Sequence, residues 1–250
     1  MPDNGEIRLN KYIAMCGVCS RREADKIIED GRIKVNGSIA LTGTKVTDSD
    51  EVLLDEKRIS LTFDKVVLAY NKPVGVVCTE RDEHAERTII EDLNFDGRVT
   101  YAGRLDKDSE GLMILTNDGD LIQAMMKARN GHEKEYVVEV DHKINDSFIS
   151  GMEKGVYLEE LQKTTRPCKL TRINDKCFKI VLTQGLNRQI RRMCKAFGYE
   201  VLKLKRIRIM NIELKGLNYS EHRKIEGREL QELYKEAGLN DLQGRKNGNK

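Results

Sequence analysis

The segment from Arg104 to Glu110 concentrates the residue types that could carry out chemistry. Its seven residues hold three carboxylates and two basic side chains. A short strand-like stretch, residues 99–101, precedes it, and the apolar run 112–116 that follows predicts a buried strand. A loop held between strands exposes reactive side chains on a rigid support. A carboxylate there could act as a nucleophile or a general base; the alternative is a solvated charged turn.

A second segment, residues 186–208, is strongly basic. It carries eight bases against one acid, Glu200, a net charge of +7 in a chain whose total is only +3. Such a concentration indicates a polyanion partner, and an ordinary basic surface is the alternative. The bases are Arg188, Arg191, Arg192, Lys195, Lys203, Lys205, Arg206 and Arg208.

The composition of the 250-residue chain permits one large domain or two smaller ones, with 39% hydrophobic residues to build a core. No apolar run approaches the roughly 18 residues that a membrane span needs, and the first residues lack the apolar segment of a signal peptide. We therefore expect a cytoplasmic protein that does not associate with membranes. Its six cysteines are scattered, which favours reduced thiols. The lone Cys16–Cys19 pair lacks a second ligand pair, so we expect no metal site.

The first sixty residues predict a small domain, residues 1–62. Apolar spacing indicates a helix over residues 8–15, and Ser20 to Glu23 reads as a capping box that opens a second helix. Asn36-Gly37 predicts the turn of a hairpin. The resulting helix pair and hairpin are mildly basic, with seven bases against four acids across the helix pair and the following strand.

The rest of the chain predicts a larger domain, residues 63–238, followed by a polar, disordered tail, residues 239–250. Strands are expected at residues 66–70, 135–140, 178–182 and 201–204, and helices at 187–197 and 228–237. Strands outnumber helices and do not alternate regularly with them. The fold class expected is therefore α+β, with a mixed, largely antiparallel sheet flanked by helices.

Three motifs of the larger domain resemble those of the pseudouridine synthases, in the branch that modifies structured ribosomal RNA. GRLDKDSEGLMILTNDG resembles the catalytic loop, which implies that Asp106 is the catalytic residue. HEKEY resembles the strand whose tyrosine, here Tyr136, stacks on the target base, although an aromatic on a strand also fits core packing. GLNRQIRRM resembles the motif in which an arginine pairs with the catalytic aspartate; Arg191 aligns best and Arg188 is the alternative. The resemblance also implies that Arg104 occupies the space left by the flipped base, and that Ile190 and Leu204 pack the floor of the site.

The reaction implied by this resemblance is the isomerisation of uridine to pseudouridine, which requires no cofactor. The target base must leave its stack to expose the reacting atoms. Asp106 would act either as the nucleophile at C1′ or as the base that removes a sugar proton.

The first domain, in the pattern RLNKYIAMCGVCSRREADKIIEDGRIKVNG, resembles the S4 RNA-binding domain. This implies that Arg21 and Arg22, at a helix start, meet RNA phosphates. The partner implied is ribosomal RNA, most closely 23S rRNA, with a tRNA anticodon as a further substrate, for a monomeric enzyme. The alternatives are an S4-type RNA-binding protein without activity and a synthase that acts on 16S rRNA. We expect RNA contacts from Arg8, Lys11, Arg21, Arg22, Lys34, Arg188 and Arg192.

Overall fold

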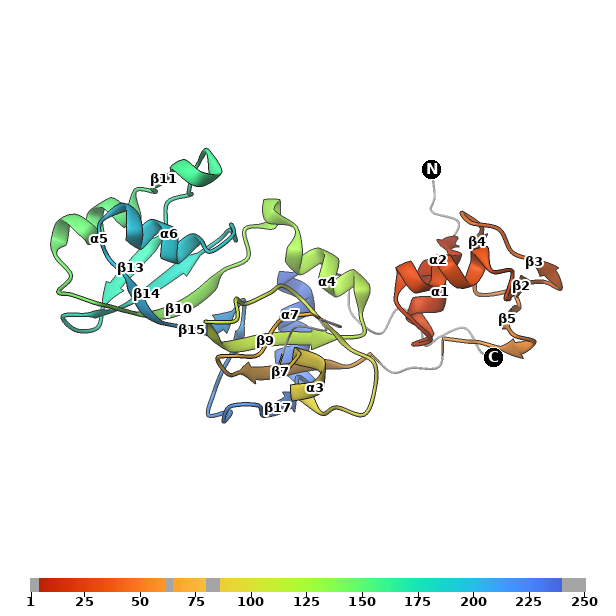
Figure 1. Cartoon of the computed structure of the whole chain (residues 1–250). Helices are drawn as coiled ribbons and strands as arrows, with labels where there is room; N and C mark the ends of the chain where they lie inside the picture. The colour runs from red at the N-terminus through yellow and green to blue at the C-terminus, as the bar shows by residue number, and fades with distance from the viewer. Residues whose placement is uncertain (1–4, 62–64, 80–85, 240–250) are drawn as a thin grey trace. The chain divides into compact units, whose positions relative to one another are not determined.

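The computed structural model describes residues 5–61, 65–79 and 86–239. The chain divides into two compact units, Met1–Lys65 and Val66–Lys250 (Figure 1). The domain boundary expected after residue 62 falls within residues 62–64, outside the described ranges. The expected tail also lies outside them, except for Leu239. No helix in the described ranges is long and apolar enough to cross a membrane.

The first unit is a helix pair with two small antiparallel sheets. Helix α1 (Leu9–Met15) buries Leu9, Tyr12 and Ile13, the apolar face that the sequence predicts. Helix α2 (Arg21–Glu29) begins at the expected capping box, in which the Ser20 hydroxyl accepts from the Glu23 N–H and the Glu23 carboxylate accepts from the Ser20 N–H. One sheet pairs β1 (Ile7–Arg8) with β4 (Lys45–Val46). The other has the order β3 (Ser38–Ile39), β2 (Ile33–Val35), β5 (Val52–Leu54) and β6 (Lys57–Arg58).

A single large sheet organises the second unit. Its order is β13 (Lys169–Arg172), β14 (Cys177–Leu182), β10 (Lys134–Val140), β15 (Val201–Ile209), β9 (Glu110–Thr116), β7 (Val67–Lys72) and β17 (His222–Lys224). Two short strands extend it: β16 (Ile212–Glu213) beside β15, and β8 (Thr100–Tyr101) beside β9. Within the described ranges every pairing in this sheet is antiparallel except that of β15 with β9. The mixed, largely antiparallel α+β fold predicted from the sequence is confirmed.

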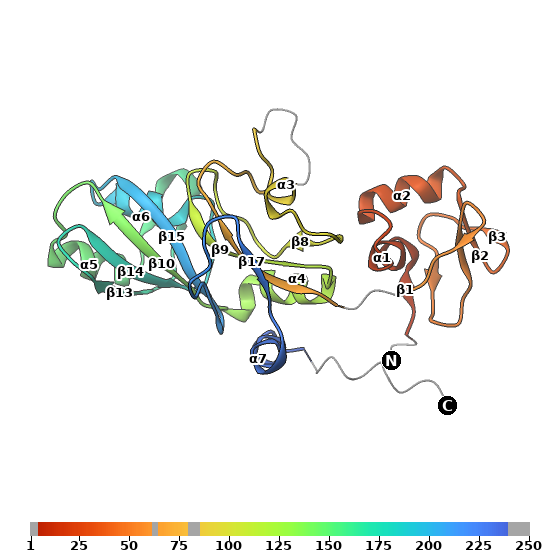
Figure 2. The ribbon, with the colours of Figure 1, turned by 90° about the horizontal axis from the view of Figure 1, so that it is seen from below.

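Helices cover the two halves of the sheet differently. In one half, α5 (Asp146–Glu153) and α6 (Gln189–Ala196) enclose a core with β10, β13, β14 and β15. In the other half, α4 (Gly119–Met126) and α7 (Gly227–Glu236) share a core with one face of β7 and β9. Helix α3 (Ile89–Leu93) packs on the opposite face, and Figure 2 shows α3 and α7 on the two sides of these strands. The shorter elements are η1 (Ala128–Asn130), β11 (Tyr157–Leu158), η2 (Glu159–Leu161) and β12 (Lys163–Thr164).

The two halves meet where β9 runs parallel to β15 for two residue pairs. Glu110 lies opposite Lys205, and Gly111 lies opposite Arg206. A Cβ atom on Gly111 would lie 2.2 Å from the carbonyl oxygen of Arg206, and the φ of Gly111 is +108°, a region that glycine alone adopts readily. Gly111 therefore permits the close approach that fixes the start of β9, and the loop before it, against β15.

Candidate active site

The loop between β8 and β9 carries Asp106 and is fastened on several sides. The Ser109 N–H donates to the carbonyl of Asp106 at 3.1 Å, and Ser109 is buried. The Gly75 N–H donates to the carbonyl of Lys107 at 2.8 Å. The side chain of Leu105 is buried in the core around α3, and its N–H lies 3.5 Å from the Cys78 sulfur. These contacts hold the loop in place, as expected for a loop held between two strands. The Asp106 side chain is 36% exposed.

A cavity of about 340 Å³ opens in front of this loop. Its walls come from segments far apart in the sequence: the Asp106 loop, the end of α4, β10, the residues before α6, and β15. Six of the residues expected to form the site line this one cavity: Arg104, Asp106, Tyr136, Arg188, Ile190 and Leu204.

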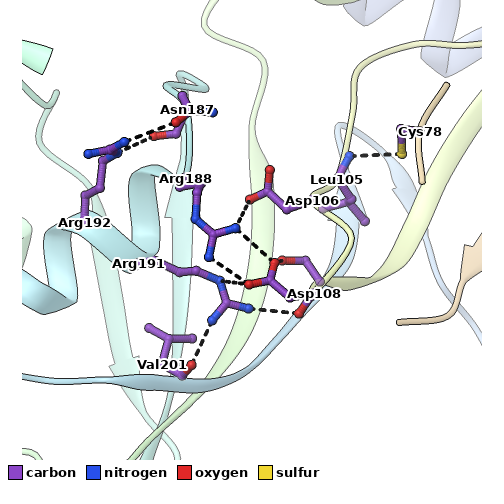
Figure 3. Close-up of polar contacts among 10 residues, drawn as sticks. Cys78, Leu105, Asp106, Asp108, Asn187, Arg188, Arg191, Arg192 and Val201 are labelled. Carbon is purple, nitrogen blue, oxygen red and sulfur yellow. Dashed lines mark hydrogen bonds and ion pairs between the residues drawn. The ribbon is translucent and has the colours of Figure 1, made fainter. Parts of the chain in front are cut away.

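Of the two candidate arginines, Arg188, the alternative, is the one that pairs with Asp106. A terminal nitrogen of Arg188 lies 3.7 Å from Oδ2 of Asp106, whereas Arg191, the candidate that aligned best, pairs with Asp108 at 3.3 Å (Figure 3). Arg191 also donates to the carbonyl of Val201 at 2.8 Å and to the carbonyl of Asp108 at 2.9 Å. The expected pairing of Arg191 with Asp106 is therefore not the one that the structure adopts.

The start of α6 explains this difference. The sequence predicted a helix from residue 187, which would place Arg188 and Arg191, three positions apart, on the same helical face. Instead the helix begins at Gln189, and Arg188 is its N-cap residue in the left-handed conformation, with a φ of 49°. Arg188 therefore leaves the helix face and reaches the loop that carries Asp106, while Arg191 stays on the helix.

Tyr136 lies in β10, between Ile180 of β14 and Arg206 of β15. Its half-buried ring packs against the cores of both halves of the sheet and lines the cavity. The register of β10 with β15 shifts between Glu135 and Tyr136, and such bulges re-aim side chains next to functional sites. An aromatic ring that is packed on one side and open to a cavity on the other can stack on a planar base.

Three cations were not among the residues expected to form the site: Lys134 and Arg206 line the cavity, and Lys72 of β7 is not part of its lining. Lys134 lines the cavity two residues before Tyr136, and its burial, with a smaller contribution from Arg206, lowers the pKa of its amine to about 8. The buried guanidinium of Arg206 donates to the carbonyl of Leu112 at 2.7 Å. Lys72 is fully buried, and its amine donates to the carbonyls of Pro73 and Val76 at 2.8 Å each; desolvation lowers its pKa. Their burial depends on distant strands, so no local pattern marks them.

Arg192, expected to contact RNA, is engaged within the protein. It forms an ion pair with Glu160 of η2 and donates to the backbone carbonyl of Asn187 at 3.0 Å and to the Asn187 side chain at 3.3 Å. These contacts join the start of α6 to the segment between β11 and β12. RNA would have to displace them to reach the Arg192 guanidinium.

The expected RNA-binding residues of the first unit lie in different settings. Arg21 and Arg22 are exposed in the first turn of α2, and Arg8 is exposed at the start of α1. Lys11 is half-buried. Lys34 forms an ion pair with Glu56 at 2.6 Å. Arg8, Arg21 and Arg22 are therefore the exposed residues among the predicted phosphate contacts in this unit.

The part of the chain that the structure describes holds no group of three or more His, Cys, Asp or Glu residues arranged to bind a metal ion. The side chains that line the cavity include one carboxylate, several cations and one phenol ring. Such a set can bind an anionic or planar ligand and can supply a nucleophile or a base.

Comparison with known proteins identifies both units. Residues 66–196 match the family of RNA pseudouridylate synthases, and residues 7–52 match the S4 domain. The chain is 48% identical to the dual-specificity RNA pseudouridine synthase RluF of an Escherichia coli O6:H1 strain, over 94% of this chain and 80% of that protein. It is 34% identical to the ribosomal large subunit pseudouridine synthase B of Bacillus subtilis, over 90% of this chain and 95% of that protein.

A solved structure supports the same conclusion. The crystal structure of a pseudouridylate synthase is similar to this fold with a TM-score of 0.67 and 28% sequence identity, over 91% of this chain and 99% of that one. The resemblance read from the motifs is confirmed. The chain belongs to the RNA pseudouridylate synthase family: it is an RNA pseudouridine synthase, an isomerase, that carries an S4 domain ahead of its synthase domain.

Proposed function

We propose that Asp106 is the catalytic carboxylate of this synthase. The observation that carries the proposal is that Asp106 shares one cavity with Tyr136 and has a guanidinium, that of Arg188, 3.7 Å away. An adjacent cation stabilises an ionised carboxylate when bound RNA excludes water. An ionised carboxylate is the form that both candidate mechanisms require.

The reaction exchanges one bond of the nucleotide for another. The bond between N1 of uracil and C1′ breaks, the base turns, and C5 bonds to C1′; N1 gains a proton and C5 releases one. Asp106 starts this either by attacking C1′ or by removing a proton from the sugar. The atoms of the substrate are all kept in the product, so the isomerisation needs no cofactor or energy source.

The neighbouring residues divide the remaining work. Tyr136 stacks on the uracil and holds it while the base turns. Arg104, exposed at the rim of the cavity, takes the place of the flipped base in the RNA. Ile190 and Leu204, both buried, form the apolar floor. Arg188 takes the role of cation partner to Asp106 that the motif alone would give to Arg191.

The substrate we propose is a uridine in a structured segment of 23S rRNA, with a tRNA uridine as a second target. The names of the two relatives support this: one is called a ribosomal large subunit pseudouridine synthase, and the other is called a dual-specificity RNA pseudouridine synthase. The enzyme would act as a monomer, in the cytoplasm, where its RNA substrates are found.

The test of the Asp106 assignment is the Asp106→Asn variant. Because C5 loses its hydrogen when it bonds to C1′, the assay follows tritium release from RNA labelled at C5 of uridine. We expect a rate loss of at least roughly 1,000-fold, with RNA binding retained. The matched control is Asp96→Asn, an exposed loop residue. Asp106→Asn turnover within tenfold of that control would end the assignment.

The substrate is tested separately. Pseudouridines are mapped in rRNA and tRNA from cells with and without the gene. Loss of one 23S site, with or without a tRNA site, is the expected result. Loss of a 16S site alone would refute the proposed substrate and leave the assignment of Asp106 standing.

A further inference from the structure

Asp108 lies at the centre of the polar contacts between the loop and α6. Its Oδ2 accepts from a terminal nitrogen of Arg188 at 2.8 Å, and its Oδ1 accepts from the other at 3.3 Å. The same Oδ2 lies 3.3 Å from Nε of Arg191, whose Nη2 donates to the Asp108 carbonyl at 2.9 Å. One residue of the loop thus holds two arginines (Figure 3).

We propose that Asp108 is a positioning residue for the reaction, which fixes the guanidinium of Arg188 beside Asp106. The proposal rests on the function proposed above for Asp106 and adds a residue that the motif comparison did not select.

The Arg188 side chain needs Asp108 as a partner because no contact with the start of its own helix fixes it. It sits in the left-handed conformation at the helix start, its side chain makes no capping bond, and that side chain is 42% exposed. A long exposed arginine samples many rotamers, and ordering it costs conformational entropy. The two-pronged contact with Asp108 restricts the planar guanidinium to one orientation.

Arg191 holds Asp108 in place. Its side chain is only 15% exposed and also donates to the Val201 carbonyl at the start of β15. The order of contacts is therefore Val201, Arg191, Asp108, Arg188 and Asp106, from the sheet to the cavity. Burial opposes the ionisation of Asp108, but the two arginines outweigh it and hold the pKa of this carboxyl below its usual value, so Asp108 is charged at neutral pH.

The geometry also leaves Asp106 available. Arg188 lies within hydrogen-bond distance of Asp108 but 3.7 Å from Asp106. The charge of Arg188 therefore acts on Asp106 while the Asp106 oxygens keep no direct bond to it. Without Asp108, the guanidinium would either close onto Asp106 and occupy the oxygens that must react, or turn to solvent. Both outcomes slow the chemical step more than they weaken RNA binding.

A double-mutant cycle tests this inference. Asp108→Ala and Arg188→Ala are made singly and together, and tritium release is measured in single turnovers with enzyme in excess. We expect Asp108→Ala to slow the chemical step roughly 10- to 100-fold, with less than about a threefold change in RNA affinity. In the Arg188→Ala background the same change should slow it less than about threefold, because Asp108 acts through Arg188. The proposal is refuted if Asp108→Ala slows the chemical step equally in the wild-type and Arg188→Ala proteins, or if it does not slow the wild-type enzyme at all.

A second measurement uses the unchanged protein, in case the substitutions prevent folding. Nitrogen relaxation of the Arg188 Nε should report a restricted guanidinium. Arg228, whose side chain is 90% exposed, gives the comparison. Equal mobility of the two side chains would overturn the proposal. These tests are distinct from that of Asp106→Asn. Activity retained in Asp106→Asn would refute the catalytic role of Asp106. The mutant cycle and the relaxation measurement report on Asp108 and Arg188 alone.

Discussion

Replacing Gly111 by alanine tests whether the stability of the fold depends on the close approach of β9 to β15. The new Cβ would lie 2.2 Å from the carbonyl oxygen of Arg206 and 2.7 Å from its nitrogen. Both are backbone atoms within a paired sheet, so no flexible side chain can move aside. The φ of +108° adds backbone strain of about 1 to 3 kcal/mol. Separating the two strands would also disturb the bond from Arg206 to the Leu112 carbonyl. We expect a total loss of about 3 to 5 kcal/mol in the free energy of unfolding.

The assay for this loss is calorimetry of the full chain, since the sequence has no tryptophan to report by fluorescence. For a unit of this size, each kcal/mol lowers Tm by about 2 to 4 °C, so Tm should fall by about 6 to 20 °C. Gly75→Ala, with a φ of +95° and no atom within 4 Å of its Cβ, isolates the backbone strain. Gly119→Ala, with neither feature, controls for the substitution itself. A Gly111→Ala loss no larger than that of Gly75→Ala would refute the close approach as the cause.

Two further predictions follow from charge. The lowered pKa of Lys134, about 8 against 10.5, means that its buried charge destabilises the fold fully below pH 8 and less as pH rises towards 10.5. Lys134→Met should therefore raise the free energy of unfolding by about 1 to 3 kcal/mol at pH 7 and by less at pH 9.5; an equal gain in denaturant titrations at both pH values would contradict this. Arg21→Glu with Arg22→Glu should weaken RNA binding and flatten the slope of log Kd against log salt. The control is Lys57→Glu with Arg58→Glu, which makes the same charge change at exposed positions of β6. An equal loss of RNA binding in this control would count against a specific role for α2.

Local features of this chain were readable from sequence because each depends on neighbouring residues. The capping box at Ser20 needs only Glu23, three positions away, and the pinned loop at Asp106 follows from a charged stretch beside a buried strand. The resemblance then supplied the chemistry of that loop. Asp106, Tyr136 and Leu204 lie in one cavity, which agrees with the motif assignments. These three residues are far apart in the sequence, so no local pattern could predict that they lie together.

The position of Arg188 shows where such reading fails. Whether an arginine lies on a helix or before it depends on the residue at which the helix begins, and boundaries are the least certain part of a helix prediction. A start two residues later than expected moved Arg188 off the face of Arg191 and gave it the contact with Asp106. The motif spacing could not reveal this, because the left-handed conformation of Arg188 carries no residue signature of its own.

The basic segment of residues 186–208 gives a second case, with a consequence for RNA binding. The net charge of +7 does not count the acids that β10 and the residue before it place beside the segment. Lys203 pairs with Glu139, and Arg208 pairs with Glu133 and Glu135. RNA phosphates that bind there must exchange with these carboxylates. The largely exposed pair of Lys203 with Glu139 is worth only about 0 to 1 kcal/mol, so RNA can displace it at little cost. The Arg208 side chain is only 22% exposed, and its pairs are harder to displace. Each displaced acid also retains its charge near the RNA. The salt dependence of binding at this face should therefore be weaker than eight bases imply, whereas the open arginines of α2 should contribute close to their full share.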